Sequence, residues 1–223
     1  LISFLDSDCI SSIEDIYTTH ADSQYYPHWY TYMAAMDLKW QQTSNVKEYS
    51  NEAIKKIILL DAVCQSPQMH GNSDINWVDN FIKEFPELAI ETYYQLAKHE
   101  LQQKRQNTTG ISKLVYSKLI KFDLKIEFFI KLLSSFPNMY LQDLKNILKQ
   151  LIAEPNTYGN LAKLADKVLT VRNKVKNENR GFWLATLFIT CPESGYSKFK
   201  NYFIKNNNLL WPLQSLMGKR EAK

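Results

Sequence analysis

Cations at helical spacing in the second half of this chain are the residues best suited to chemistry, and that chemistry is anion binding. They recur three or four residues apart in three consecutive segments, and four more crowd the connection that follows. Residues at this spacing share one face of a helix, so each segment predicts a basic stripe that attracts phosphates or acidic side chains. The alternative is a row of ordinary solvated helix faces. The candidates for binding an acidic partner or a phosphate are Lys118, Lys121, Lys125, Lys145, Lys149, Lys163, Lys167, Arg172, Lys174, Lys176 and Arg180.

An aromatic cluster near the start of the chain offers a second kind of contact surface. Flat aromatic rings stack on bases or anchor protein interfaces. One stripe at helical spacing is typical of core packing and comprises Trp29, Met33, Met36 and Trp40. Three tyrosines lie off that stripe and are the candidate partner contacts: Tyr25, Tyr26 and Tyr32.

No residue pattern for catalysis, a cofactor or a metal is visible. None of the six glycines completes a Gly-x-x-x-x-Gly-Lys-Ser/Thr loop, and neither Gly-x-Ser-x-Gly nor His-Glu-x-x-His occurs. His20 and His28 are eight residues apart, whereas neighbours on one helix face are three or four apart, so both are interpreted as surface or capping residues. We expect no enzyme activity, cofactor or metal. An all-α enzyme with scattered acid–base residues is the remaining enzymatic alternative.

The three cysteines indicate a reducing compartment. Cys9, Cys64 and Cys191 are far apart and odd in number, so we interpret them as buried free thiols of a cytoplasmic protein. Apolar runs such as residues 57–60 are far shorter than a membrane span, and no signal peptide is visible. Because the chain begins at Leu1, it is interpreted as a fragment of a longer protein.

Apolar residues recur every three or four positions from end to end, which predicts an all-α fold. Proline and N-capping residues separate the segments. The chain contains one weak internal repeat: similar apolar stripes follow Phe85-Pro86 and Phe136-Pro137. This repeat favours an irregular α-solenoid of antiparallel, HEAT-like helix pairs over a globular bundle. We expect about a dozen helices, near residues 10–20, 27–42, 51–65, 74–84, 87–105, 111–121, 124–135, 139–153, 158–170, 178–190, 194–205 and 208–217.

Charge divides the chain into two parts of opposite sign. Residues 1–100 hold 15 Asp and Glu against 6 Lys, and residues 101–223 hold 21 Lys and Arg against 8 Asp and Glu. The polar run 102–109 lies where the sign changes. We therefore predict an acidic helical half, 1–105, and a basic helical half, 106–223, within one continuous helical-repeat domain. The two halves could pair with each other or with neighbouring domains of a longer chain.

The last quarter of the chain resembles a known family. Its motifs are Leu-Ala-Lys-Leu-Ala-Asp-Lys-Val-Leu at 161–169, Arg-Gly-Phe-Trp-Leu-Ala at 180–185, Leu-Phe at 187–188, Pro-Glu at 192–193, Tyr196, Leu-Trp-Pro-Leu at 210–213 and Leu-Met-Gly at 216–218. This run resembles the C-terminal helical repeats of large bacterial NACHT-type signal-transduction NTPases. The resemblance implies a sensor or scaffold region attached to an ATPase outside this sequence, in a protein similar to immune receptors that defend against phage.

These observations predict a non-enzymatic protein-interaction, sensor or scaffold module of a larger bacterial signalling or defence NTPase. The alternative is a helical-repeat protein that binds nucleic acid through its basic half. Arginine is scarce among the cations of that half. Because arginine is favoured for reading base edges, such binding would be non-specific. We expect no membrane partner.

Overall fold

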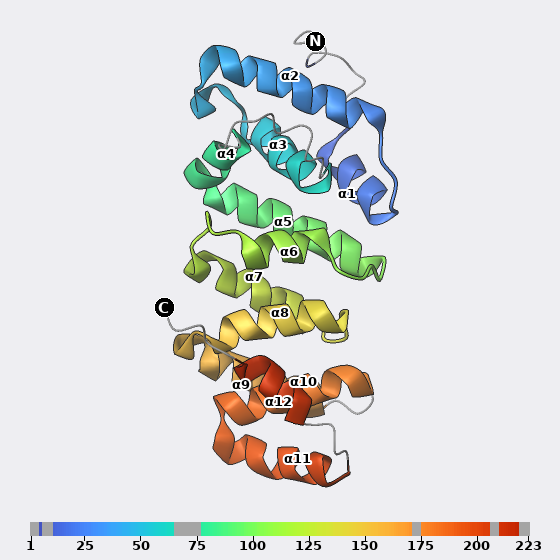
Figure 1. Ribbon diagram of the computed structural model, residues 1–223, viewed down its shortest axis with the longest axis vertical. Helices are drawn as coiled ribbons and strands as arrows, with labels where there is room; N and C mark the ends of the chain where they lie inside the picture. Colours follow the sequence, from blue (N-terminus) through green and yellow to red (C-terminus); the bar gives the residue numbers. More distant parts are fainter. Residues whose placement is uncertain (1–4, 6–10, 65–76, 171–174, 206–209, 219–223) are drawn as a thin grey trace. The chain divides into compact units, whose positions relative to one another are not determined.

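The computed structural model describes residues 5, 11–64, 77–170, 175–205 and 210–218. Over these residues the chain is all-α without a β-strand, which confirms the predicted all-α helical-repeat class (Figure 1). In chain order the helices are α1 (Ile13–Ala21), α2 (Pro27–Thr43), the 3₁₀ turn η2 (Val46–Glu48), α3 (Asn51–Val63), α4 (Val78–Glu84), α5 (Pro86–Gln102), α6 (Thr109–Tyr116), α7 (Phe122–Ser135), α8 (Leu141–Ile152), the 3₁₀ turn η3 (Pro155–Thr157), α9 (Tyr158–Thr170), α10 (Asn177–Thr190), α11 (Pro192–Lys205) and α12 (Leu210–Met217).

The chain divides into two compact units, residues 1–125 (unit 1) and residues 126–223 (unit 2). The division falls inside α7, whereas the charge changes sign near residue 105, before α6 begins. Unit 1 therefore contains the whole acidic part of the sequence and the first cations of the basic part.

Unit 1 is built around α3, which packs against α1, α2, α4, α5 and α6. The helix begins after Ser50, whose hydroxyl accepts a hydrogen bond from the Ala53 backbone N–H at 3.2 Å. Its apolar residues cover every side, and residues 57–60 are all buried. Four consecutive residues of a helix point to all of its sides, so this part of α3 is covered all round and forms the core of the unit.

The closest helix packing in unit 1 joins α5 to α6. Gly110 of α6 faces the backbone of α5, where an added Cβ would lie 2.4 Å from the Ala97 nitrogen and 2.5 Å from the Tyr93 carbonyl oxygen. No side chain fits at these distances. The missing Cβ therefore sets how closely the two helices approach.

Unit 2 is built around α10, which packs against α8, α9, α11 and α12. Residues 181–187 are all buried. The α10 side chains also fix the turn that precedes α8: the Asn179 amide donates to the Met139 carbonyl at 2.9 Å, and the Trp183 indole N–H donates to the Pro137 carbonyl at 3.0 Å. The core helix of unit 2 thus makes polar contacts with a distant turn as well as apolar ones with its neighbours.

Candidate functional site

The first predicted basic stripe, at Lys118, Lys121 and Lys125, is not present. Helix α6 ends at Tyr116, and Lys118 and Lys121 are exposed in the connection to α7. Lys125 is 4% exposed, and its ammonium donates to the Ser117 carbonyl at 2.7 Å. Burial lowers the pKa of this amine. Because the helix stops where Ser117 becomes extended, the three lysines share no helix face, and the prediction of a stripe here is wrong.

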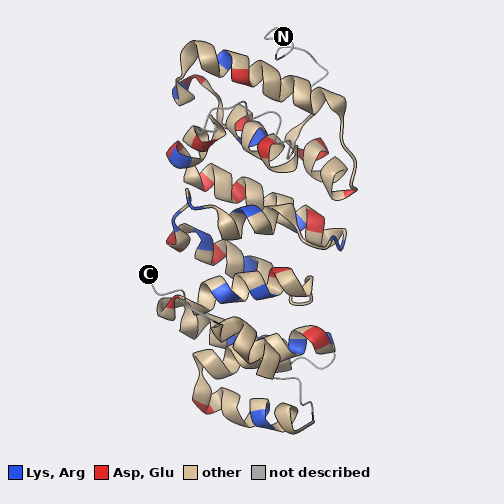
Figure 2. Ribbon diagram, viewed as in Figure 1, with Lys and Arg blue, Asp and Glu red and all other residues tan. Residues whose placement is uncertain are grey.

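Two other predicted pairs do lie on helices of unit 2. Lys145 and Lys149 are half-buried on α8, and Lys163 and Lys167 are exposed on α9. In each helix the two lysines accompany one aspartate, so positive charge predominates (Figure 2).

The cations around the start of α10 lie in different environments. Lys176 is exposed at the N-cap, and Arg180 is half-buried one turn later, where it lines a pocket of unit 2. Arg172 and Lys174 lie outside the described residues. Of these cations, Arg180 therefore lies in a concave site of unit 2.

Two of the three candidate tyrosines lie at the surface. Tyr25 is 48% exposed and Tyr26 is 42% exposed, and both rings stand edge-on to the buried Trp29. Tyr32 is only 6% exposed, since it precedes the buried Ala35 and Met36 by three and four residues on the core face of α2. Burial raises its pKa to about 12. The prediction of Tyr32 as a surface contact is wrong.

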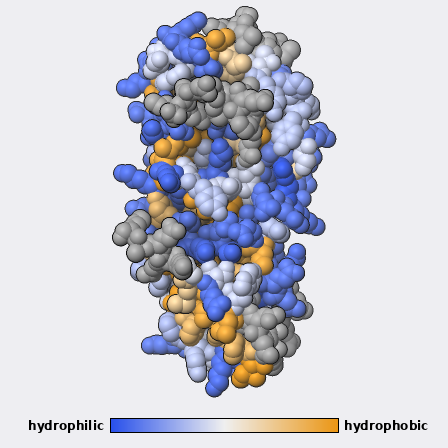
Figure 3. All heavy atoms as spheres, viewed as in Figure 1, coloured by the Kyte–Doolittle hydropathy of each residue, from blue (hydrophilic) through white to orange (hydrophobic). Residues whose placement is uncertain are grey.

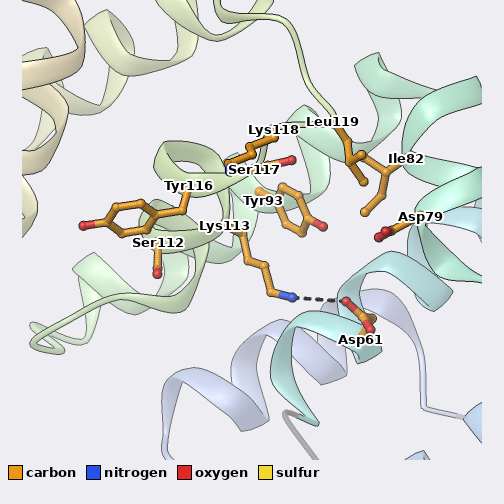
Figure 4. Close-up of a pocket in the computed structure, with 10 residues that line it drawn as sticks. All are labelled: Asp61, Asp79, Ile82, Tyr93, Ser112, Lys113, Tyr116, Ser117, Lys118 and Leu119. Carbon is orange, nitrogen blue, oxygen red and sulfur yellow. Dashed lines mark hydrogen bonds and ion pairs between the residues drawn. The ribbon is translucent and has the colours of Figure 1, made fainter. Parts of the chain in front are cut away.

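A polar pocket of about 340 Å³ lies between helices α3 to α6 of unit 1 (Figure 4). Asp61 on α3 and Asp79 on α4 form one side, and Lys113 reaches in from α6. The Lys113 ammonium lies 3.1 Å from the Asp61 carboxylate, whose side chain is 5% exposed. The pocket could not be recognised in the sequence, because its residues come from positions 61 to 119 and share no short motif.

The side chains of this pocket can hold a ligand by hydrogen bonds. Tyr93 is 1% exposed, and its phenol group points toward the aspartates in Figure 4. Burial raises its pKa, and the negative charges of Asp61 and Asp79 raise it further. The phenol is therefore a neutral donor rather than a base. A phenol, a carboxylate and an ammonium can hold a small polar ligand, and none of the described residues that line the pocket is a Cys or His.

A second polar cluster of unit 1 is fully internal. Glu100 on α5 is 0% exposed and accepts hydrogen bonds from the backbone N–H groups of Thr109 and Gly110 at 3.0 and 2.9 Å. Its carboxylate therefore caps the N-terminus of α6, where the helix dipole favours negative charge. The ring of His20, 2% exposed, lies 3.1 Å from the same carboxylate. His20 is thus a core residue, and its interpretation as a surface or capping residue is wrong.

Large apolar side chains are exposed on the last two helices of unit 2. On α11 these are Tyr196 and Ile204, and on α12 they are Leu210, Trp211 and Met217, each between 47% and 67% exposed. Apolar atoms reach the surface over this end of unit 2 in Figure 3. We call these five residues the α11–α12 apolar surface. The sequence feature that could have indicated this surface is the apolar composition of α12. Only Pro212 and Leu216 of that helix are buried, so most of its apolar residues remain at least partly exposed.

The cysteines agree in part with the expected free thiols. Cys64 is buried and unpaired with another cysteine, and burial raises the pKa of its thiol to about 12. Cys191 is also free but only partly buried, and Cys9 lies outside the described residues.

No three His, Cys, Asp or Glu side chains of the described residues come together as metal ligands. Among the helices described above, none combines the length and apolarity needed to cross a bilayer. No family model, curated protein or solved structure matches this chain. The likeness of residues 161–217 to NACHT-type NTPases therefore stays a prediction.

Proposed function

We propose that this chain is a cytoplasmic, non-enzymatic protein-interaction module that binds its partner through unit 2. The observation that carries the proposal is the α11–α12 apolar surface. Large apolar groups that are half-exposed on two helices, each packed on α10, favour burial against a partner, because removing apolar area from water is the main driving force of protein association.

Trp211 is the best-placed anchor of this surface. Its ring is 52% exposed and stands edge-on to the fully buried ring of Phe182, with centroids 5.2 Å apart. The helix that carries it fits closely on α10, since a Cβ on Gly181 would lie 3.0 Å from the Pro212 ring. A tryptophan held in one position loses little freedom on binding, and tryptophan is enriched among interface hot spots.

We further propose, from the likeness of residues 161–217, that the module is the sensing or scaffolding part of a larger bacterial signalling or defence NTPase. The Arg-Gly-Phe-Trp-Leu-Ala motif contributes both Gly181 and Phe182, which position α12. The test is to sequence the complete gene. A phosphate-binding loop of the Gly-x-x-x-x-Gly-Lys-Ser/Thr type before the residues of this chain supports this origin. A complete gene without such a loop contradicts it.

The interaction itself is tested by comparing two variants that place a charge at an exposed aromatic residue. Trp211→Glu should abolish capture of specific host or phage proteins, since it replaces the tryptophan of the apolar surface with a carboxylate. Tyr30→Glu is the matched control, because Tyr30 is 37% exposed on α2 of unit 1 and does not line the polar pocket of that unit. The proposal fails if both variants retain the same partners, or if the wild-type chain is a monomer that captures nothing.

Non-specific nucleic-acid binding is the second candidate, and the exposed Lys163 and Lys167 on α9 favour it. Phosphate neutralisation by surface lysines makes binding fall steeply with salt. Changing both lysines to Glu should therefore weaken binding of a labelled oligonucleotide and reduce its dependence on salt. Unchanged binding by the double variant rules out this use of α9.

A further inference from the structure

A pocket of about 460 Å³ in unit 2 lies between α9, α10 and α11. Leu169 at the end of α9 and Leu184 on α10 give it apolar walls, and Arg180, Lys198 and Asn201 supply N–H donors. A cavity with apolar walls and a few converging polar groups is the usual form of a site for a small ligand, and the polar groups here include two cations.

Arg180 is the unsatisfied cation of this pocket. Its side chain is half-buried on α10, one turn before Leu184, and no described group forms a hydrogen bond or ion pair with its guanidinium. A guanidinium has five N–H donors in a planar fork that fits a carboxylate or a phosphate in a bidentate manner. Because it has lost part of its water without gaining a partner, an anion in the pocket would complete its hydrogen bonding.

The charge of the pocket selects the kind of anion. Lys198 forms an ion pair with the Asp166 carboxylate of α9, so the ammonium is largely neutralised and Arg180 supplies about one uncompensated positive charge. A carboxylate, with one negative charge, matches it. A phosphate monoester carries about −1.5 to −2 at neutral pH, so Arg180 alone would leave part of its charge uncompensated.

We propose that this pocket binds the side-chain carboxylate of an acidic segment in a protein partner. The inference rests on the proposed function and specifies the chemistry of the partner. The carboxylate forms the bidentate pair with Arg180, the Asn201 amide donates to it, and Leu169 and Leu184 contact its methylene groups. Lys163 and Lys167, on the adjoining helix α9, attract the rest of an acidic segment over a longer distance.

The experiment is an NMR titration of the ¹⁵N-labelled full chain with the blocked peptide acetyl-Ala-Glu-Ala-amide. Its uncharged counterpart acetyl-Ala-Gln-Ala-amide, inorganic phosphate and a single-stranded oligothymidylate are titrated separately. The glutamate peptide should shift the Nε–H signal of Arg180 in a saturable manner, and the glutamine peptide should not. Arg180→Gln should weaken binding by about tenfold or more, because a charge-assisted bidentate pair is lost.

Two further variants separate a specific site from general attraction. Lys200→Gln is the matched control, since Lys200 is exposed on α11, does not line the pocket and carries the same charge; binding should change by less than about twofold. Asp166→Asn should strengthen peptide binding several-fold, because it releases Lys198 to the ligand.

The proposal is overturned if the glutamate peptide leaves the Arg180 signal unmoved, if Arg180→Gln and Lys200→Gln weaken binding equally, or if phosphate or the oligonucleotide binds more tightly through Arg180. Its failure is distinguishable from that of the proposed function. If Trp211→Glu abolishes partner capture and Arg180→Gln does not, the chain is still an interaction module. That result contradicts only the proposal that Arg180 binds an acidic segment.

Discussion

The two units use their charged groups in opposite ways. In unit 1, Glu100 caps a helix inside the core and Asp61 pairs with Lys113 beside a pocket. In unit 2, Arg180 has no partner among the described groups, and the α11–α12 apolar surface faces solvent. The comparison contrasts two acidic side chains of unit 1 that hold neighbouring helices together with an arginine of unit 2 that pairs with no described group.

The largest expected effect is a steric test of how unit 1 is assembled. Gly110→Ala places a Cβ against the backbone of α5, 2.4 Å from the Ala97 nitrogen, and should lower the free energy of unfolding by about 3–4 kcal/mol. Gly159→Ala in α9 is the control, because nothing lies within 4 Å of its Cβ position. That change should be neutral or stabilise by up to about 1 kcal/mol. Urea denaturation measures both, and equal effects would contradict the close α5–α6 contact.

The second prediction tests whether the buried charge of unit 1 is structural. Glu100→Gln leaves the N–H groups of Thr109 and Gly110 with a weaker acceptor, and should cost about 2–3 kcal/mol of stability. Glu87→Gln, an exposed position on the same helix, should change stability by less than about 0.5 kcal/mol. Thermal unfolding followed by circular dichroism compares the two. A stable Glu100→Gln protein would remove the main contrast between the units.

The third prediction compares ion pairs in the two units. Lys113→Met leaves the Asp61 carboxylate, 5% exposed, without its ammonium, and should destabilise the protein by about 1 kcal/mol. Lys131→Met breaks an exposed pair with Glu127 one turn away on α7 and should cost less than about 0.5 kcal/mol. Chemical denaturation at low and high salt separates them. Salt should reduce the effect of Lys131→Met and leave that of Lys113→Met nearly unchanged, because exposed ion pairs are screened more strongly than buried ones.

The last prediction concerns pH. Burial raises the pKa of Tyr32 to about 12 from its ordinary value of 10. Between these values the unfolded chain loses the proton while the folded protein keeps it, so stability falls as the pH rises from 10 to 12. Tyr32→Phe should make that fall shallower. Tyr30→Phe, which removes an exposed phenol from the same helix, is the control, and an identical slope in both variants would contradict the prediction.

Periodicity in the sequence predicted the helices because each stripe repeats over several turns. The predicted range 158–170 coincides with α9, and most other ends differ by a few residues. The exception is α6, which ends at Tyr116 rather than near 121. The spacing of the lysines placed Lys125 on one helix face with Lys118. In the structure the chain turns between them, and the Lys125 ammonium donates a hydrogen bond to the Ser117 carbonyl in that turn.

The sites were less accessible to sequence reasoning than the helices. Spacing predicted that Arg180 is available to an anion, but not that Lys198, Asn201 and Leu169 surround it, since these come from other helices. Burial of Tyr32 and His20 was missed for a related reason. Whether a polar aromatic residue lies inside depends on which helix covers its face, and Lys56 of α3 lies over the Tyr32 ring at 5.6 Å.

The hydrogen bonds that α10 makes to the turn before α8 have a consequence during synthesis. Trp183 and Asn179 lie 46 and 40 residues after the carbonyls of Pro137 and Met139 that they bind. A ribosome must therefore add α8, α9 and the first half of α10 before this bend can acquire its final partners. We expect the nascent α7–α8 segment to gain protection from amide exchange late, only after residue 183 has left the exit tunnel.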